Sequence, residues 1–214
     1  MGAAEGAFMW VSGEVRASQE ETLLKAPSRA LWRYWQAARA GRSSPARGDL
    51  DLRQLRGLMP FLFIAAQTRP MGCYVWRLAG TGLCDLHRRE LTGSSLMSGW
   101  ENFERNVIQR FLAGVTGRHK QALLHLAFLT ERGQRIDADM LALPLIAADG
   151  ASTHVFGGLF PRANQEIRPY ESLTPLEVSF ARFLEPASAD VSSQQAETQA
   201  PRKFQVISGG RDHS

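Results

Sequence analysis

Residues 61–83 read FLFIAAQTRPMGCYVWRLAGTGL, and this stretch decides the fold. It holds two short apolar runs, Phe61–Ala66 and Cys73–Ala79, separated by the turn-forming residues Pro70-Met71-Gly72. Aromatic and β-branched side chains over six or seven positions, bounded by proline and glycine, are typical of strands. We therefore predict two neighbouring antiparallel strands that form a hairpin.

After the hairpin, a short helical segment (Leu83–Arg89), a longer helix and three further strand-like runs are expected. Ser98–Glu101 has the Ser-x-x-Glu form of a capping box, and the residues after it are apolar at helical spacing as far as Gly117. The following runs have short connections that contain glycine, which suit antiparallel neighbours. These runs are Gln121–Thr130, Arg135–Ala147 and His154–Phe160. The order predicts an α+β fold, a five-stranded antiparallel sheet with the central helices on one face.

Flanking helices are predicted on both sides of this unit. Residues 28–40 carry an apolar stripe at helical spacing. Near the other end, Thr174–Glu177 has an N-cap residue, a proline at the first helical position and a capping glutamate, which predicts a second flanking helix. The expected parts are an N-terminal extension (1–27), a domain with its leading helix (28–165), a C-terminal helix (166–185) and a disordered tail (186–214).

The composition is typical of a cytoplasmic globular protein. Of 214 residues, 44% are hydrophobic and 21% are charged, which are ordinary values for a chain with a packed core. No apolar run is long enough to cross a membrane as a helix, and the first residues lack the basic region of a secretory signal. The two cysteines, Cys73 and Cys84, both lie in apolar segments, which indicates a reducing compartment.

The chain is mildly basic, with 25 Lys and Arg against 21 Asp and Glu. The basic residues gather around the leading helix and the loop after it, at Lys25, Arg29, Arg33, Arg39, Arg42 and Arg47. We interpret them as a solvated helix face. The alternative is a contact with an acidic partner or with nucleic acid, whose binders concentrate basic charge on one face.

Several short motifs resemble a known family when they are taken together. They are LWRYW (31–35), RAGRSSPAR (39–47), LMPFLF (58–63), YVWRLAGTGL (74–83), ELTG (90–93) and LPL (143–145). The combination is similar to a PAS subfamily of alphaproteobacteria that has a tryptophan-rich leading helix and an Arg-Leu-Ala-Gly-Thr motif. The resemblance covers roughly residues 28–165. It implies a sensory or interaction module that works in signal transduction, and it carries no catalytic residues to transfer.

A PAS resemblance also implies a ligand pocket between the sheet and its helices. On the second strand, Tyr74, Trp76 and Leu78 share one face. The residues expected to line a pocket for a small apolar ligand are Tyr74, Trp76, Leu78, Leu83, Phe103, Val107 and Phe111. The alternative is that these large side chains simply fill the core at ordinary packing density.

The leading helix has an apolar stripe that must be buried somewhere. Leu31, Trp32 and Trp35 pack either on the open face of the chain's own sheet or against a partner. Two buried tryptophans can anchor an interface. We therefore name these three residues as a candidate partner interface, and the partner as another protein or a second copy in a homodimer.

No cofactor or metal is implied. Neither cysteine has the neighbours of the Asn-Cys-Arg-Phe-type motif found in light-sensing PAS domains, so flavin is not supported. Haem needs an axial ligand, usually histidine. His87, His119 and His125 are available, but no haem signature accompanies them.

Two functional alternatives to a non-catalytic regulatory module stay open. Asp137 and Asp139 lie two apart on one predicted strand, so their carboxylates share a face and could perform acid–base chemistry in an enzyme. Arg135 lies on the same face and favours a solvated sheet surface instead. The second alternative is a DNA-associated regulator that uses the basic leading helix and the arginine-rich loop.

Overall fold

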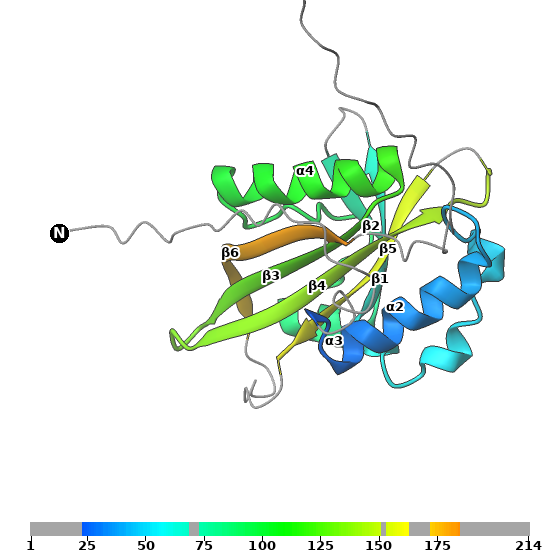
Figure 1. Cartoon of the computed structure of the whole chain (residues 1–214). Coiled ribbons are helices and arrows are strands. Elements are labelled where there is room, and N and C mark those ends of the chain that lie inside the picture. Colours follow the sequence, from blue (N-terminus) through cyan, green and yellow to red (C-terminus); the bar gives the residue numbers. More distant parts are fainter. Residues whose placement is uncertain (1–22, 69–72, 151–152, 163–171, 185–214) are drawn as a thin grey trace, which may run out of the picture.

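The computed structural model describes residues 23–68, 73–150, 153–162 and 172–184. Within these residues, six strands form one antiparallel sheet in the order β2-β1-β5-β4-β3-β6 (Figure 1). In chain order the elements are α2 (Ala26–Arg39), the short 3-10 helices η1 (Arg47–Asp49), η2 (Leu52–Leu55) and η3 (Met59–Phe61), β1 (Leu62–Thr68), β2 (Cys73–Ala79), α3 (Thr81–His87), α4 (Asn102–Arg118), β3 (Gln121–Thr130), β4 (Arg135–Ile146), β5 (Thr153–Pro161) and β6 (Leu173–Leu184). The predicted turn at Pro70–Gly72 and the predicted tail (186–214) lie outside the described residues, as does most of the predicted N-terminal extension.

The predicted hairpin and the predicted three-strand meander lie in one sheet. β1 pairs with β2 on one side, where Phe63 is opposite Ala79. On its other side β1 pairs with β5, where Phe63 is opposite Gly157. An added side chain at Gly157 would collide with the Phe63 ring, so glycine is needed where these two strands meet. This pairing confirms the α+β arrangement expected from residues 61–83.

The sheet is buried on both faces because residues alternate along its strands. On β1, Phe63 and Ala65 belong to the apolar cluster beneath α3 and α4. Leu62 and Ile64 belong to a second cluster beneath α2. Figure 1 shows α4 and α2 on opposite sides of the sheet. The central helices therefore cover one face, as predicted, and the leading helix covers the other.

The predicted C-terminal helix is wrong, because Leu173–Leu184 forms the edge strand β6. This strand pairs with β3 along its whole length, from Leu173 opposite Thr130 to Leu184 opposite Gln121. The sheet therefore has six strands in place of the predicted five. The cap-like signal at Thr174–Glu177 is a local preference that the tertiary structure overrides.

The neighbours of this segment explain why it is extended. Without β6, the strand β3 would be a long edge with both faces buried, and exposed hydrophobic edges are prone to aggregate. Pro175 is compatible with the position, because proline is tolerated on edge strands and at bulges, and it lies next to a register shift. The ring of Phe183 packs 4.6 Å from that of Phe111 on α4, close against Gly114, where a Cβ atom would overlap it. Packing against α4 thus stabilises β6.

No helix in the described part of the chain is long and apolar enough to span a membrane.

Candidate functional site

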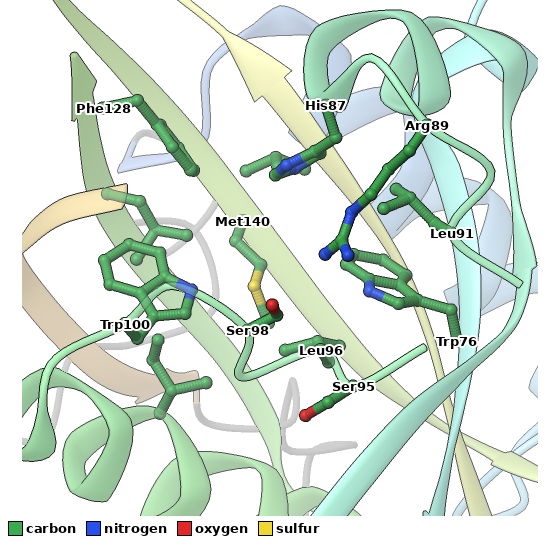
Figure 2. Close-up of a pocket in the computed structure, with 13 residues that line it drawn as sticks. Trp76, His87, Arg89, Leu91, Ser95, Leu96, Ser98, Trp100, Phe128 and Met140 are labelled. Atoms are coloured by element: carbon green, nitrogen blue, oxygen red, sulfur yellow. The ribbon is translucent and has the colours of Figure 1, made fainter. Parts of the chain in front are cut away.

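A small cavity lies between the sheet and the layer formed by α3, α4 and the connection between them. Its volume is about 30 Å³, which is enough for about one water molecule. Figure 2 shows two indole rings and a phenyl ring around it, with a histidine and an arginine side chain on the side of α3. The lining residues are Trp76, His87, Arg89, Leu91, Ser95, Leu96, Ser98, Trp100, Ile108, Leu126, Phe128, Met140 and Leu159.

The connection between α3 and α4 forms one wall because it is hydrogen-bonded to the outer edge of β2. The Trp76 amide donates to the Ser94 carbonyl at 3.1 Å, and the Gly93 amide donates to the Trp76 carbonyl at 2.7 Å. The Leu96 amide continues this pairing by donating to the Tyr74 carbonyl at 2.9 Å. Gly93 has φ +83°, a conformation that other residues rarely adopt. These bonds hold Leu91, Leu96 and Trp100 over the sheet.

Edge-to-face aromatic contacts fix the other walls. The Trp76 ring lies 5.2 Å from Phe63, and the Trp100 ring lies 5.6 Å from Phe128. His87 also meets Phe128 edge-on, at 6.4 Å. Such contacts stabilise aromatic pairs by about 0.5–1.5 kcal/mol beyond the burial of their area. The cavity walls are therefore mainly apolar, and aromatic contacts order them.

Polar groups of the cavity come from α3 and from the connection after it. His87 is half-buried, whereas Arg89, Ser95 and Ser98 are exposed. Burial, with a smaller contribution from the positive charge of Arg89, lowers the pKa of His87 below its ordinary value. The imidazole is therefore mainly neutral at neutral pH, so one ring nitrogen donates a hydrogen bond and the other accepts one. The site suits an apolar body that carries one polar group.

Five of the seven predicted pocket residues lie in the core cluster beneath α3 and α4, but only Trp76 lines the cavity. The other four fill the core, as the alternative interpretation holds: Tyr74, Leu83, Val107 and Phe111. The Tyr74 hydroxyl lies 3.0 Å from Thr116 Oγ1. The side chains beside Trp76 therefore contribute mainly to packing.

The other two predicted pocket residues lie elsewhere. Between Ile64 and Ala65 the pairing of β1 with β2 shifts by one residue, so Ile64 is opposite Leu78 and Ala65 is opposite Trp76. This bulge reverses the alternation, and Leu78 packs on the α2 side of the sheet. Phe103 is 59% exposed on the first turn of α4. Both predictions are therefore wrong. Leu78 lies on the opposite face of the sheet because of the bulge, and Phe103 continues the apolar spacing of α4 at a position that the sheet does not cover.

Sequence reasoning missed most of the lining. Trp100, Phe128 and Met140 are not among the predicted pocket residues, and the sequence offers His87 only as an available haem ligand. Phe128 and Met140 lie on adjacent strands, and the burial of β3 and β4 on both faces removes the alternation of polar and apolar residues that would reveal which side chains face the helices. Trp100 lies just before α4, within the Ser98–Glu101 capping motif. The size of this side chain is a signal, because a tryptophan is expected to be largely buried even when it lies in a loop.

The predicted partner interface is buried within the chain. Leu31 and Trp35 are 0% exposed and Trp32 is 7% exposed. The Trp35 indole donates to the Pro144 carbonyl at 2.9 Å, and that of Trp32 donates to Gln121 Oε1 at 2.6 Å. The tryptophans therefore take the first of the two expected positions, the chain's own sheet. These contacts bury both rings and occupy both N–H groups. The prediction that Leu31, Trp32 and Trp35 form a partner interface is therefore wrong.

The enzyme alternative needs Asp137 and Asp139 as a pair of free carboxylates, and both are paired with arginines. Asp139 is buried, and Nε and Nη2 of Arg162 each lie 3.0 Å from its Oδ1. Asp137 is more exposed and bonds to Nε of Arg135 at 3.0 Å. The interpretation as a solvated sheet face holds for Asp137 and fails for Asp139. On this face of β4, Asp137 accepts a hydrogen bond from Arg135 and Asp139 accepts one from Arg162.

The remaining candidate ligand residues are scattered. His125 Nε2 lies 3.7 Å from Asp139 Oδ1, and burial lowers the pKa of His125. His119 is at the end of α4, where Nδ1 lies 2.8 Å from the Ser44 hydroxyl. Cys73 and Cys84 are half-buried free thiols. Among the described residues, no three histidine, cysteine or acidic side chains come together as a metal site.

Comparison with known proteins gives one finding on the family. A family model described as PAS domain matches residues 24–160, a span that contains α2, the cavity and strands β1 to β4, and nearly all of β5. No curated protein matches the chain.

Proposed function

The chain belongs to the PAS domain family, and we propose that it is a non-catalytic sensory and regulatory module. In this proposal a small, largely apolar ligand is sensed in the cavity of Figure 2. A protein partner, which includes a second copy of the chain, reads the resulting change.

The construction of the cavity carries the proposal. Apolar and aromatic side chains form most of its lining, and the few polar groups converge from one side, a combination typical of small-molecule sites. The present volume of about 30 Å³ is too small for an organic ligand. A ligand would therefore enter as the connection between α3 and α4 moves outward, because this wall lies at the sheet's outer edge while the strands are held on both sides.

The two faces of the sheet provide a route from this cavity to α2. Met140 and Leu159 line the cavity. Their neighbours along the strands, Leu141 and Phe160, belong to the cluster beneath α2. A ligand that shifts β4 or β5 would change the surface on which α2 packs. Regulation requires that the two packings differ in affinity for ligand or partner.

The chemistry of the lining supports a role without catalysis. No carboxylate or thiol lines the cavity, so His87 has no acidic partner there. A nucleophile needs an adjacent base, and that base needs a group to orient it. Neither of these arrangements occurs among the thirteen lining residues.

Native mass spectrometry of the protein purified from its own host tests the proposal, since it measures bound mass and subunit number together. Ser98→Trp places a large side chain at the mouth of the cavity, and Ala113→Trp is the control on an exposed position of α4 that does not line it. We expect a bound small molecule on the wild-type protein and on Ala113→Trp, and at least a tenfold lower occupancy on Ser98→Trp. A wild-type chain without bound mass, or equal occupancy in both variants, would contradict ligand sensing at this site.

A further inference from the structure

We propose that a second site, a basic groove at the C-terminal end of α4, binds a small organic oxyanion, a phosphate or a carboxylate. The groove lies where the C-terminal ends of α2 and α4 meet the first residue of β3 and the last residues of β6. Its volume is about 340 Å³, which lies within the range of small-molecule pockets. Its polar lining consists of Arg39, Ser43, Arg118, His119, Lys120 and Gln121.

The positive charge of this groove is not neutralised by the described part of the chain. Arg39 lies on α2, Arg118 on α4 and Lys120 in the connection between α4 and β3. None of the three forms an ion pair with a described carboxylate. The lining includes no acidic residue. Nearby Arg42 differs, because its Nη2 lies 2.6 Å from Asp49 Oδ2. Three cations that share one hollow repel one another, and a bound anion would relieve that repulsion.

Helix dipoles account for only part of this charge. The C-terminal end of a helix carries about half a negative charge, and this favours a basic residue in its last turn. Arg39 and Arg118 lie in the last turns of α2 and α4. The two ends together offset about one positive charge of the three. A net positive charge of roughly two therefore stays available to a ligand.

Neutral groups hold two of the cations in place before any anion binds. Nε of Arg39 donates to Gln36 Oε1 and Nη1 donates to the Arg42 carbonyl at 2.9 Å. The Arg39 guanidinium also lies 5.7 Å from the centre of the Trp35 ring. Lys120 Nζ lies 4.8 Å from the centre of the Phe183 ring. Because these contacts orient the side chains without cancelling their charge, binding loses little conformational entropy.

Hydrogen-bond donors accompany the cations. Gln121 is buried, and its Oε1 accepts the Trp32 indole N–H, so the amide NH₂ of Gln121 is its remaining donor group. The Ser43 hydroxyl supplies another donor at the rim. Oxyanions bind most strongly to charged donors combined with such neutral ones. The same glutamine contacts α2, so an anion here would connect the groove to the helix that carries the proposed output.

The test measures binding of inorganic phosphate and of citrate to the full chain by calorimetry, at constant ionic strength set with sodium chloride. Arg118→Gln/Lys120→Gln removes two groove charges. Arg53→Gln/Arg56→Gln is the matched control, because it removes two exposed charges that do not line the groove. One lies on η2 and the other directly follows it. We expect phosphate or citrate to bind wild type and control equally and the groove variant at least tenfold more weakly.

The comparison of the two anions identifies the class of ligand. Tighter binding of phosphate indicates a phosphorylated ligand, and tighter binding of citrate indicates a carboxylate. Equal weakening in both double variants would show a nonspecific charge effect and would overturn the proposal. Failure of both anions to bind would also overturn the proposal. So would binding of duplex DNA that both double variants weaken equally, because the basic residues would then act as a general nucleic-acid surface.

Discussion

The two aspartates of β4 differ in burial, and this difference predicts how much each contributes to stability. Asp139 is 3% exposed at its side chain, and its partner Arg162 is 34% exposed. We expect Asp139→Asn to lower the free energy of unfolding by about 2 kcal/mol, less than the roughly 3–5 kcal/mol lost when a fully buried pair is broken, because Arg162 keeps partial contact with water. Urea denaturation measures this change.

Asp137→Asn is the matched control for this prediction. Its ion pair with Arg135 is 31% and 45% exposed, and such pairs contribute about 0–1 kcal/mol. Equal losses for the two variants would mean that Asp139 is not buried as described. Preserved folding together with loss of an enzymatic turnover in either variant would instead support the catalytic alternative.

The buried histidine of the cavity predicts a pH dependence of stability. Burial lowers the pKa of His87 below 6.5 in the folded chain. The pKa of His87 in the unfolded chain is about 6.5, its ordinary value. Between this value and the lower pKa of the folded chain, the unfolded chain binds a proton that the folded chain does not. The free energy of unfolding therefore falls as the pH drops through 6.5, and it stays reduced below the pKa of the folded chain. We expect this contribution to approach at most about 1.4 kcal/mol per pH unit.

His87→Gln isolates this contribution. His125 and His154 also have pKa values lowered by burial, but they are present in both proteins, so the difference between the two curves reports His87 alone. Urea denaturation from pH 7.5 to pH 5.5 should give a steeper loss for wild type than for His87→Gln. Parallel curves would show that His87 binds a proton equally in the folded and unfolded chains.

At the scale of elements, β6 makes a prediction that separates a strand from a helix. In an edge strand, successive amides point alternately toward the neighbouring strand and away from it. Hydrogen exchange measured by NMR should therefore show alternating protection along Leu173–Leu184. The alternation should be interrupted where the pairing with β3 shifts, near Val178 and Pro175. Continuous protection over successive residues would indicate the helix that the local sequence favours.

Burial explains which elements could be predicted from the sequence. α2, α4 and strands β1 to β5 have a periodicity or a bounded apolar run that reflects their contacts, so their positions follow from local pattern. β6 carries a proline, and its apolar residues Leu176, Phe180 and Leu184 lie at helical spacing, so its local pattern favours a helix. Its conformation depends on the edge of β3, more than forty residues away, and no local pattern reports that edge.

The candidate site could be predicted only in outline. Trp76 follows from alternation on β2, but Leu78 does not, because one bulge between them inverts the face. The remaining walls come from the connection before α4 and from strands buried on both sides. Their side chains meet through tertiary pairing, such as that of Leu96 with Tyr74 across the edge of β2.

At the scale of the whole molecule, the two apolar clusters share one sheet. β1 contributes Phe63 to one cluster and Ile64 to the other, and β4 does the same with Met140 and Leu141. Neither helical layer can separate from the sheet without exposing side chains of strands that also form the opposite core. The layers are therefore one cooperative unit, which is what transmission across the sheet requires.

This shared sheet predicts a single unfolding transition. Trp32 and Trp35 lie in the cluster beneath α2, and Trp76 and Trp100 lie in the cluster beneath α3 and α4. The fifth tryptophan, Trp10, lies outside the described residues, so it is replaced with phenylalanine in both variants. Replacing either pair with phenylalanine as well leaves two tryptophans that report on the other face. We expect fluorescence of each variant and its far-ultraviolet circular dichroism to give the same urea midpoint, because both faces unfold together. A fluorescence midpoint of the α2 side well below the circular dichroism midpoint would show that α2 detaches independently, and the signal route through β4 and β5 would then lack its mechanical basis.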